Sequence, residues 1–327
     1  MPTDKITSRI GIRKYEGMSS VGFAGSGPPP LRRDVARFGG PPPGRWSSER
    51  SMIRRLLAVV AAAASTLALT SVVVAAPPGA LRVASDISYA PLEFRPAGSS
   101  RVEGFDYDLA QALGARLHER IDFANHDFST LLPGLERGRF DLVVSALSDT
   151  RTREAQVTFV DYFLSGTGIL TRAGNPAHLW NLASLCGHRV SVEAGTSGET
   201  AARAQSARCA EIGLGSIALV TAPTDEAALA AFTAGKTDAH LSDYPVVAYL
   251  ARTLGEGKAY EVIGRPFDVV PFGIAVAKSN RALLDDVRGA LLALVRDGTY
   301  DRLLRKWNLE EGALRSAPID AGTKFQQ

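Results

Sequence analysis

Polar side chains follow four predicted strands of this 327-residue chain, at the points where those strands end. In open α/β sheets, ligands bind outside the carboxyl ends of the strands. The candidate binding region therefore comprises the segments that follow Ser85, Ser145, Glu193 and Ser242. Two carboxylates, Asp86 and Glu193, lie at these strand ends, and in a closed site they would resist ionising unless a positive group arrived. The pattern therefore favours a ligand that carries a cation.

No motif for catalysis or for a cofactor accompanies these acids. The sequence contains no G-x-G-x-x-G, no P-loop and no G-x-S-x-G, so it gives no support for a nucleotide-binding protein or a serine hydrolase. Its five His residues are scattered and its two Cys residues form no C-x-x-C, so we expect no zinc site. The sequence therefore predicts no metal, no cofactor and no catalytic residue.

Alternating strands and helices position these strand ends. The first group is predicted as strand, amphipathic helix, helix and buried strand over 81–85, 105–117, 129–137 and 140–145. A second group of alternating strands and helices follows, over 189–193, 197–209, 217–221, 225–234 and 239–242. A strand over 272–277 and helices broken at Gly298 complete the chain. This alternation indicates two α/β lobes with mostly parallel sheets.

The formal net charge of +3 comes from the N-terminal part of the chain. Residues 1–76 hold 11 of the 37 Lys and Arg residues and four of the 34 acids, which leaves 26 basic and 30 acidic residues in 77–327. The predicted folded part is therefore mildly acidic, with a net charge of −4. We expect no nucleic-acid partner, because proteins that bind nucleic acids carry a basic surface.

The first 76 residues are typical of a leader followed by a secretory signal. Residues 1–51 contain two Pro-Pro-Pro runs and no apolar periodicity, so we expect them to be disordered or untranslated, with the true start at Met52. Arg54 and Arg55 precede 21 uncharged residues that end in small side chains, which predicts a signal peptide over 52–76. An uncleaved anchor is the alternative, because 21 apolar residues can span a bilayer. No Cys follows before Cys186, so we expect no lipid anchor.

Eight short segments, taken in order, carry a resemblance to a known family. They are 81–94 (LRVASDISYAPLEF), 104–109 (GFDYDL), 127–132 (DFSTLL), 138–143 (GRFDLV), 152–153 with 157–159 (TR and VTF), 192–196 (VEAGT), 242–243 (SD) and 298–307 (GTYDRLLRKW). Together they resemble the periplasmic solute-binding proteins of polar amino acid ABC transporters, extracellular solute-binding protein family 3. The resemblance covers about 81–309.

The resemblance implies a type 2 periplasmic-binding fold, in which two α/β lobes joined by two strands close on a ligand. Lobe 1 would comprise 77–167 plus 271–327, and lobe 2 would comprise 168–270 with the hinge strands. The two crossover strands would fall near 165–171 and 266–273. The ligand cleft would then lie between the lobes.

The resemblance also implies how the amino acid group of a ligand is held. Arg153 matches the arginine that grips the α-carboxylate, since a planar guanidinium offers two parallel donors. Asp243 matches the acid that binds the α-ammonium, although its place before Pro245 also suits a helix N-cap. Ser148 matches a hydroxyl that helps to hold the amino acid, and Ala146 matches a residue whose backbone carbonyl binds the ammonium.

Backbone groups are expected to add a further contact. Thr196 and Ser197 follow Gly195 at a predicted strand-to-helix turn, where N–H groups form an anion site. A hydroxyl that caps a helix uses the same geometry, so the structural and the binding roles coincide at this turn.

The side chain of the ligand would meet a second set of residues. Tyr89 and Phe128 match the aromatic pair that sandwiches it, and their places in a Pro-bearing turn and just outside a helix start favour a cleft wall over the core. Asp86 and Ser145 match positions that meet the distal cation in relatives that bind lysine, arginine or ornithine. Glu193 departs from the family pattern, in which Lys, Gln or an apolar residue is common there.

These residues together imply a binding protein without catalysis. It would capture a polar L-amino acid by lobe closure and deliver it to the permease of an ABC transporter, as a monomer in the periplasm. Cationic ligands (lysine, arginine, ornithine) rank first, neutral polar ligands such as glutamine second, and acidic ligands last. The alternative is an enzyme similar to cyclohexadienyl or arogenate dehydratases, with Glu193 or Glu199 as the acid in the cleft.

Cys186 and Cys209 are expected to form a disulfide, because an oxidising compartment permits one. The strand over 187–193 runs about 23 Å toward the cleft. The helix over 197–209 runs back by about 20 Å. The two Cys residues should therefore lie at the same end of lobe 2, opposite the cleft.

Overall fold

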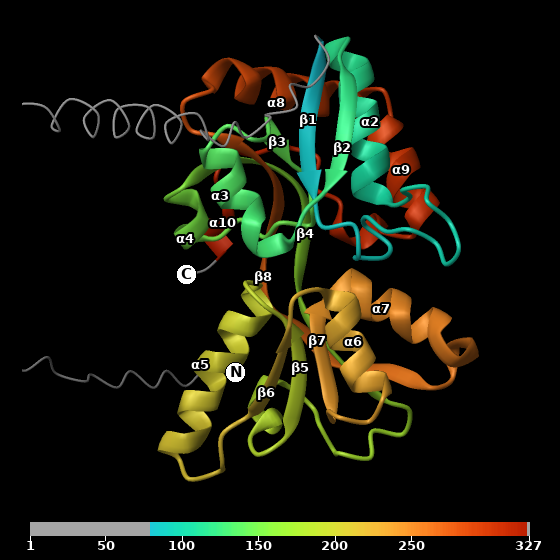
Figure 1. Cartoon of the computed structure of the whole chain (residues 1–327), viewed down its shortest axis with the longest axis vertical. Coiled ribbons are helices and arrows are strands. Elements are labelled where there is room, and N and C mark those ends of the chain that lie inside the picture. Colours follow the sequence, from blue (N-terminus) through green and yellow to red (C-terminus); the bar gives the residue numbers. More distant parts are fainter. Residues whose placement is uncertain (1–78, 326–327) are drawn as a thin grey trace, which may run out of the picture. The chain divides into compact units, whose positions relative to one another are not determined.

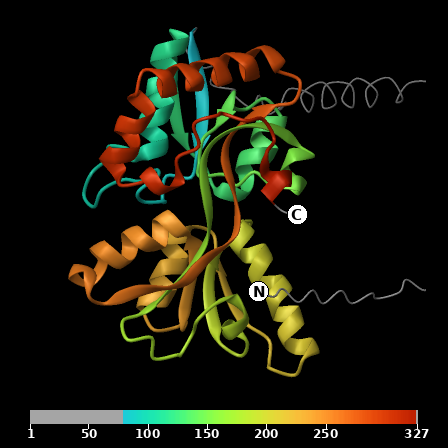
Figure 2. The ribbon, with the colours of Figure 1, turned by 180° about the vertical axis from the view of Figure 1, so that it is seen from behind.

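Two long antiparallel strands, β4 (Val157–Arg172) and β8 (Tyr260–Ala277), connect two groups of shorter elements (Figure 1). They pair along their whole length, and from behind they are again seen side by side between the two groups (Figure 2). The computed structural model describes residues 79–325, so the predicted leader and signal peptide over 1–51 and 52–76 lie outside the described residues. In the described part, eight strands form one sheet in the order β2-β1-β3-β8-β4-β7-β5-β6.

Lobe 1 lies at the β2 end of this sheet. Its short strands are β1 (Ala80–Ser85), β2 (Arg120–Asn125) and β3 (Leu142–Val143). β1 pairs in parallel with β2 and β3, and β3 is antiparallel to β8. Its helices are α2 (Phe105–Leu117), α3 (Leu131–Glu136), α4 (Arg151–Glu154), α8 (Arg281–Arg296), α9 (Thr299–Trp307) and α10 (Gly322–Phe325), with 3₁₀ turns at Phe128–Thr130 and Glu310–Gly312.

Lobe 2 lies at the β6 end. Its strands are β5 (Arg189–Glu193), β6 (Ala218–Ala222) and β7 (Ala239–Asp243). β5 is parallel to both β6 and β7, and β7 is antiparallel to β4. Its helices are α5 (Ser197–Glu211), α6 (Asp225–Thr233) and α7 (Tyr244–Thr253), with 3₁₀ turns at Leu182–Leu185 and Leu254–Gly257.

The predicted α/β class with two lobes is confirmed, and a few predicted elements differ. The strand expected over 140–145 is reduced to β3, because the chain turns at Ala146, which has φ 42° and donates its N–H to Asp106. The helix expected over 129–137 begins as a 3₁₀ turn. The strand expected over 272–277 is the end of β8, and β2, at the sheet edge, lies outside the predicted elements. The exact residue boundaries of the lobes stay a prediction.

Both lobes are built around buried apolar side chains that hold the strand ends in place. In lobe 1 the ring of Phe105 lies 6.0 to 6.1 Å from those of Tyr162, Phe163 and Tyr300. In lobe 2 the apolar side chains of β5 and β7 pack with the buried Cys209 of α5. Gly298 has φ 75° and separates α8 from α9, as predicted. Among residues 79–325, no helix combines the length and the apolar character needed to cross a bilayer.

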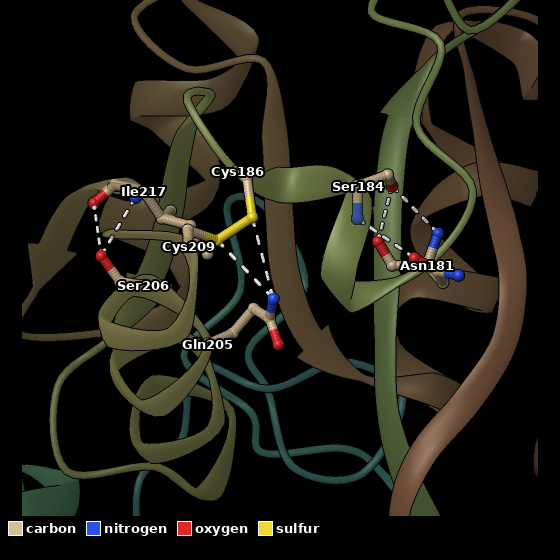
Figure 3. Close-up of a disulfide and its surroundings, with 7 residues drawn as sticks. All are labelled: Asn181, Ser184, Cys186, Gln205, Ser206, Cys209 and Ile217. Atoms are coloured by element: carbon tan, nitrogen blue, oxygen red, sulfur yellow. Dashed lines mark hydrogen bonds between the residues drawn. A yellow bond between two sulfur atoms is a disulfide. The ribbon is translucent and has the colours of Figure 1, made fainter. Parts of the chain in front are cut away.

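The disulfide between Cys186 and Cys209 is present, with 5.4 Å between the two Cα atoms (Figure 3). Cys186 precedes β5 and Cys209 lies near the end of α5, so the bond joins the ends of these elements that lie away from Glu193 and Ser197. The amide Nε2 of Gln205 lies 3.7 and 3.6 Å from the two sulfur atoms. The disulfide prediction is therefore confirmed.

Replacement of Cys209 by Ser should lower the free energy of unfolding by about 3 kcal/mol, because the open chain gains conformational freedom over the closed loop. Urea titration of the oxidised protein and the variant measures this. Ligand affinity should stay within about twofold, since the bond lies at the far end of β5 and α5 from the cleft. Equal urea midpoints for the two proteins would contradict the prediction.

Candidate functional site

A small cavity between the two lobes brings the predicted ligand residues together. Both lobes contribute to it, through the strand ends and turns identified from the sequence. All eleven predicted positions line it: Asp86, Tyr89, Phe128, Ser145, Ala146, Ser148, Arg153, Glu193, Thr196, Ser197 and Asp243. One further residue, Glu93, completes the lining.

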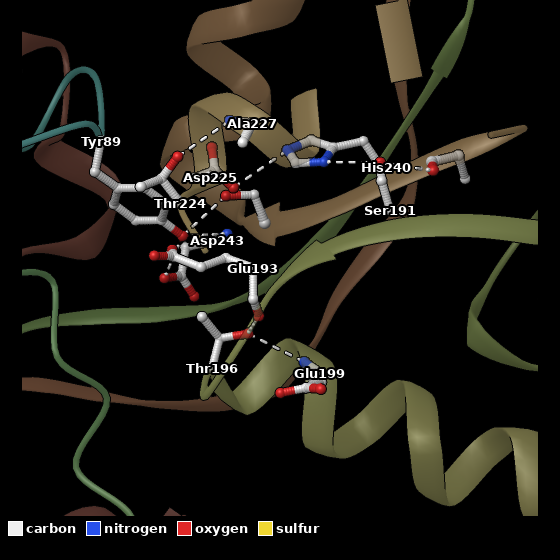
Figure 4. Close-up of polar contacts among 12 residues, drawn as sticks. Tyr89, Ser191, Glu193, Thr196, Glu199, Thr224, Asp225, Ala227, His240 and Asp243 are labelled. Carbon is white, nitrogen blue, oxygen red and sulfur yellow. Dashed lines mark hydrogen bonds and ion pairs between the residues drawn. The ribbon is translucent and has the colours of Figure 1, made fainter. Parts of the chain in front are cut away.

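Hydrogen bonds cross this cavity from one lobe to the other. The hydroxyl of Tyr89 donates to Oδ2 of Asp243 at 2.8 Å, and it accepts from the Asp243 N–H at 3.0 Å and from the Ser242 hydroxyl at 2.9 Å (Figure 4). The hydroxyl oxygens of Ser148 and Ser197 lie 3.3 Å apart. The lobes are therefore in contact across the cleft, in a closed arrangement.

Asp243 ends β7 and occupies the N-cap position of α7, but its side chain makes no capping hydrogen bond. Its carboxylate instead faces Tyr89 and the cavity. The pKa of Asp243 is raised to about 7, chiefly by burial and also by the charge of Asp225, while Tyr89 and Arg153 act in the opposite direction. The side chain of Asp243 therefore does not cap α7 but lines the cavity.

Arg153 extends from the short helix α4 toward the facing lobe. The side chain of Thr150 caps this helix and accepts from the Arg153 N–H. The guanidinium donates to the carbonyl of Ser148 at 2.9 Å and to that of Gly195 in lobe 2 at 3.1 Å, and it lies 5.3 Å from the ring centroid of Phe128. Burial lowers the pKa of Arg153 to about 10, so it stays charged near neutral pH. Its remaining N–H donors are available to an anion.

The turn between β5 and α5 is the place where an anion site is predicted. Thr196 is the N-cap of α5: its hydroxyl accepts from the Glu199 N–H at 3.1 Å and donates to the Glu193 carbonyl at 2.8 Å. The carboxylate of Glu199 accepts from the Gly195 N–H and pairs with Arg203 (Figure 4 shows Glu199 beside Thr196). Thr196 therefore caps the helix with its side chain while it lines the cavity.

Glu193 and Asp86 meet from opposite lobes. Glu193 is only 3% exposed, so its side chain is turned inward, away from solvent. Burial, together with the carboxylates of Asp225 and Asp86, raises the pKa of Glu193 to about 10, so Glu193 is protonated near neutral pH. Burial also raises the pKa of Asp86, although the Ser88 hydroxyl and the Phe128 N–H, which bind its carboxylate, act in the opposite direction.

Two more buried acids, Glu93 and Asp106, lie behind these residues and were missed from the sequence as site residues. The Ser145 hydroxyl donates to Glu93 at 2.9 Å, and burial holds the pKa of Glu93 well above its usual range. Asp106, in the first turn of α2, is fully buried and accepts from the Ala146 N–H and the Tyr162 hydroxyl. The available signal for Glu93 was an acid flanked by apolar residues in the turn after the first strand.

Asp225 is a third acid that the sequence analysis did not place at the site. It begins α6, is 3% exposed, and its Oδ1 lies 3.3 Å from Nε2 of the buried His240 (Figure 4). Its charge raises the pKa values of Glu193, Asp243 and Tyr89. Within residues 79–325, the acidic side chains form no group with the geometry of a metal site. The cavity therefore carries an excess of carboxyl groups that a cationic ligand would relieve.

The chain is similar to known amino acid-binding proteins. It is 28% identical to the arginine-binding protein ArgT of Corynebacterium glutamicum over 243 residues. This alignment covers 74% of this chain and 78% of that protein. An ancestral arginine-binding protein bound to arginine has a TM-score of 0.64 at 30% identity, over 70% of this chain and 98% of that one. The ancestral amino acid-binding protein AncCDT-1, a precursor of cyclohexadienyl dehydratase, has a TM-score of 0.62 at 30% identity. The match covers 70% of this chain and 95% of that one.

A family model matches the same region that carries the eight sequence segments. It describes the bacterial extracellular solute-binding proteins of family 3, and it matches residues 81–310. This range includes every residue that lines the cavity between the lobes. With its two-lobe fold and a family match over most of its length, the chain belongs to the bacterial extracellular solute-binding proteins of family 3.

Proposed function

We propose that this protein binds a free L-amino acid with a cationic side chain and delivers it to the permease of an ABC transporter. One observation carries the proposal. A guanidinium, Arg153, lines the same cavity as acids from both lobes, Asp86, Glu193 and Asp243. An amino acid that carries one carboxylate and two cations complements this arrangement of charges.

The carboxylate end of the ligand lies against Arg153. The guanidinium uses some of its donors on the carbonyls of Ser148 and Gly195, which fix its orientation at the cavity wall. The hydroxyls of Ser148 and Ser197, which lie near each other, are donors for the same carboxylate. Because α5 is 15 residues long and its N-terminus faces this point, its N–H groups favour a negative charge there.

The ammonium and the distal cation meet the acids. Asp243 binds the α-ammonium with its carboxylate, which lines the cavity. The hydroxyl of Tyr89, from lobe 1, donates to this carboxylate and holds it in place. Asp86 and Glu193 bind the cation at the end of the ligand side chain, while the rings of Tyr89 and Phe128 contact its methylene groups. Arginine, lysine and ornithine therefore rank above glutamine, and aspartate and glutamate rank last.

The comparisons support this choice of ligand. The relative from Corynebacterium glutamicum is named as an arginine-binding protein, and a solved structure with the same fold holds arginine. A signal peptide over 52–76, cleaved near Ala76, would place the mature protein in the periplasm, where the permease of such a transporter receives its ligand.

The protein is proposed to lack catalysis. An enzyme similar to cyclohexadienyl dehydratase needs an acid aimed at the substrate, and Glu199, one of the two candidates, bonds instead to Gly195 and Arg203. Glu193, the other candidate, lies beside Asp86 and suits a cation. The likeness to AncCDT-1 does not favour the enzyme, since that protein is itself described as amino acid-binding.

Calorimetric titration with arginine, lysine, ornithine, glutamine, glutamate and aspartate tests the proposal directly. We expect tight binding of the cationic ligands, weaker binding of glutamine, and no binding of the acidic ligands. Incubation with prephenate or arogenate should give no product. Tight binding of aspartate or glutamate with the cationic ligands silent, or turnover of either dehydratase substrate, would overturn the proposal.

Replacement of Arg153 by Ala should weaken arginine binding at least tenfold, about 1.4 kcal/mol, because the α-carboxylate loses its charged partner. Calorimetry at neutral pH measures the change. Arg208→Ala, which removes an exposed arginine of α5, is the matched control and should bind as the parent does. Equal affinities for the two variants would contradict the assigned role of Arg153.

Arginine binding should release protons, and its affinity should rise with pH. In the free protein the pKa of Glu193 is about 10 and that of Asp243 about 7, so at neutral pH Glu193 is protonated and Asp243 is partly so. A bound cation favours the ionised forms and lowers both pKa values, so arginine binding releases protons. For each proton released, the affinity for arginine rises by up to about tenfold per pH unit.

Titrations from pH 5.5 to 8.5, in buffers of different ionisation enthalpy, count these protons. Glu193→Gln should release fewer protons, flatten the pH profile and weaken arginine about tenfold near the upper end. Glutamine binding should stay unchanged. Glu211→Gln, at the exposed end of α5, is the control. A profile that is the same in Glu193→Gln and the parent would contradict the role of Glu193.

A further inference from the structure

The last described residues, 313–325 (the C-terminal segment), lie beyond the family match and fold back on lobe 1. The segment runs beside the first half of β4, with bridges between Phe163 and Ala313 and between Val160 and Ile319. In lobe 1, β4 pairs with β8 along one of its edges. Without the C-terminal segment, the other edge of β4 would be open. The C-terminal segment therefore covers the edge of β4, and such edges need cover in stable proteins.

The C-terminal segment then reaches the turn that carries Arg153. The Gly322 N–H donates to Oδ2 of Asp149 at 2.8 Å. The Thr323 N–H donates to Oε1 of Glu154 at 2.9 Å, and the Thr323 hydroxyl bonds to the same carboxylate. Asp149 and Glu154 lie on either side of Arg153, so two consecutive residues of the segment hold both ends of its turn.

The fit at Gly322 is close. A Cβ atom built on this glycine would lie 2.0 Å from the backbone oxygen of Asp149, so any larger residue must move the segment or the turn. By contrast, a Cβ on Gly289, in the exposed part of α8, would meet no atom within 4 Å. The two glycines therefore offer a matched pair of substitutions.

The same contacts supply donors to two buried acids. Asp149 and Asp161 are both 0% exposed, and each keeps one oxygen without a hydrogen-bond partner among the described residues. The other oxygen of each accepts from the C-terminal segment, through the Gly322 and Ala321 N–H groups. Burial raises the pKa of Asp149 to about 7 and that of Asp161 to about 8, while these N–H groups act in the opposite direction. Without the segment, two buried carboxyl groups beside the turn would lose their donors.

We propose that the C-terminal segment is a positioning element for ligand binding: Gly322 and Thr323 hold the turn of 149–154 so that Arg153 meets the α-carboxylate. The inference rests on the proposed function for the role of Arg153, and it adds that residues outside the family match control the affinity. Gly322 and Thr323 touch no ligand and act through Asp149 and Glu154.

Hydrogen–deuterium exchange of the ligand-free protein tests the positioning step. Gly322→Ala should increase exchange in 149–156, whereas Gly289→Ala should leave these residues as in the parent. Thr323→Val, which removes only the hydroxyl, should give a smaller increase in the same peptide, and it provides the test if Gly322→Ala does not fold. Unchanged exchange in 149–156 for both Gly322→Ala and Thr323→Val would overturn the inference.

A double-mutant cycle with arginine as the ligand tests the route through Arg153. Gly322→Ala alone should weaken arginine binding about fivefold, within the range found for coupled neighbours. In the Arg153→Ala background it should have no further effect, because the group that it positions is absent. An equal loss in both backgrounds would indicate general destabilisation and overturn the inference. If the parent binds no amino acid, the proposed function fails, and the exchange experiment alone decides the inference.

Discussion

Carboxyl groups enclosed between the two lobes repel each other, and the rest of the site depends on how that repulsion is managed. Asp86, Glu193, Asp225 and Asp243 lie in or beside one cavity, and burial removes the water that would screen them. Protonation relieves part of the repulsion, as the raised pKa values of Glu193 and Asp243 show. A bound cation would favour the ionised forms of these acids and relieve the repulsion that remains.

Backbone groups that a helix or strand leaves unpaired do much of the positioning around these acids. The N–H of Phe128 binds Asp86, the N–H of Ala146 binds Asp106, and the N–H of Asp243 binds the hydroxyl of Tyr89. Phe128 begins a 3₁₀ turn, Asp243 ends β7, and Ala146 lies in the turn that follows β3. The parallel strands bring such ends to one place, so the cavity is lined by donors as well as by acids.

Residues near strand ends could be predicted from the sequence because the sheet rule and the family resemblance point to the same segments. All eleven predicted ligand residues line the cavity, and Cys186 and Cys209 are bonded. Glu93, Asp106 and Asp225 could not be found in this way, because their roles depend on burial by parts of the chain that are distant in sequence. The C-terminal segment was likewise beyond reach, since its contacts with Asp161 and Asp149 join residues 160 and 173 positions apart in the sequence.

The order of the strands in the sheet determines when the site can form during synthesis of the chain. In lobe 1, β8 lies between β3 and β4, so the sheet of the first lobe to be synthesised stays incomplete until residues near 270–277 arrive. The strands of lobe 2 lie in one continuous stretch of chain, which ends with the first half of β8 paired to the second half of β4. A chain that emerges from its N-terminus can therefore complete lobe 2 while lobe 1 is still open. The cavity, which needs both lobes, can form only when synthesis is nearly finished.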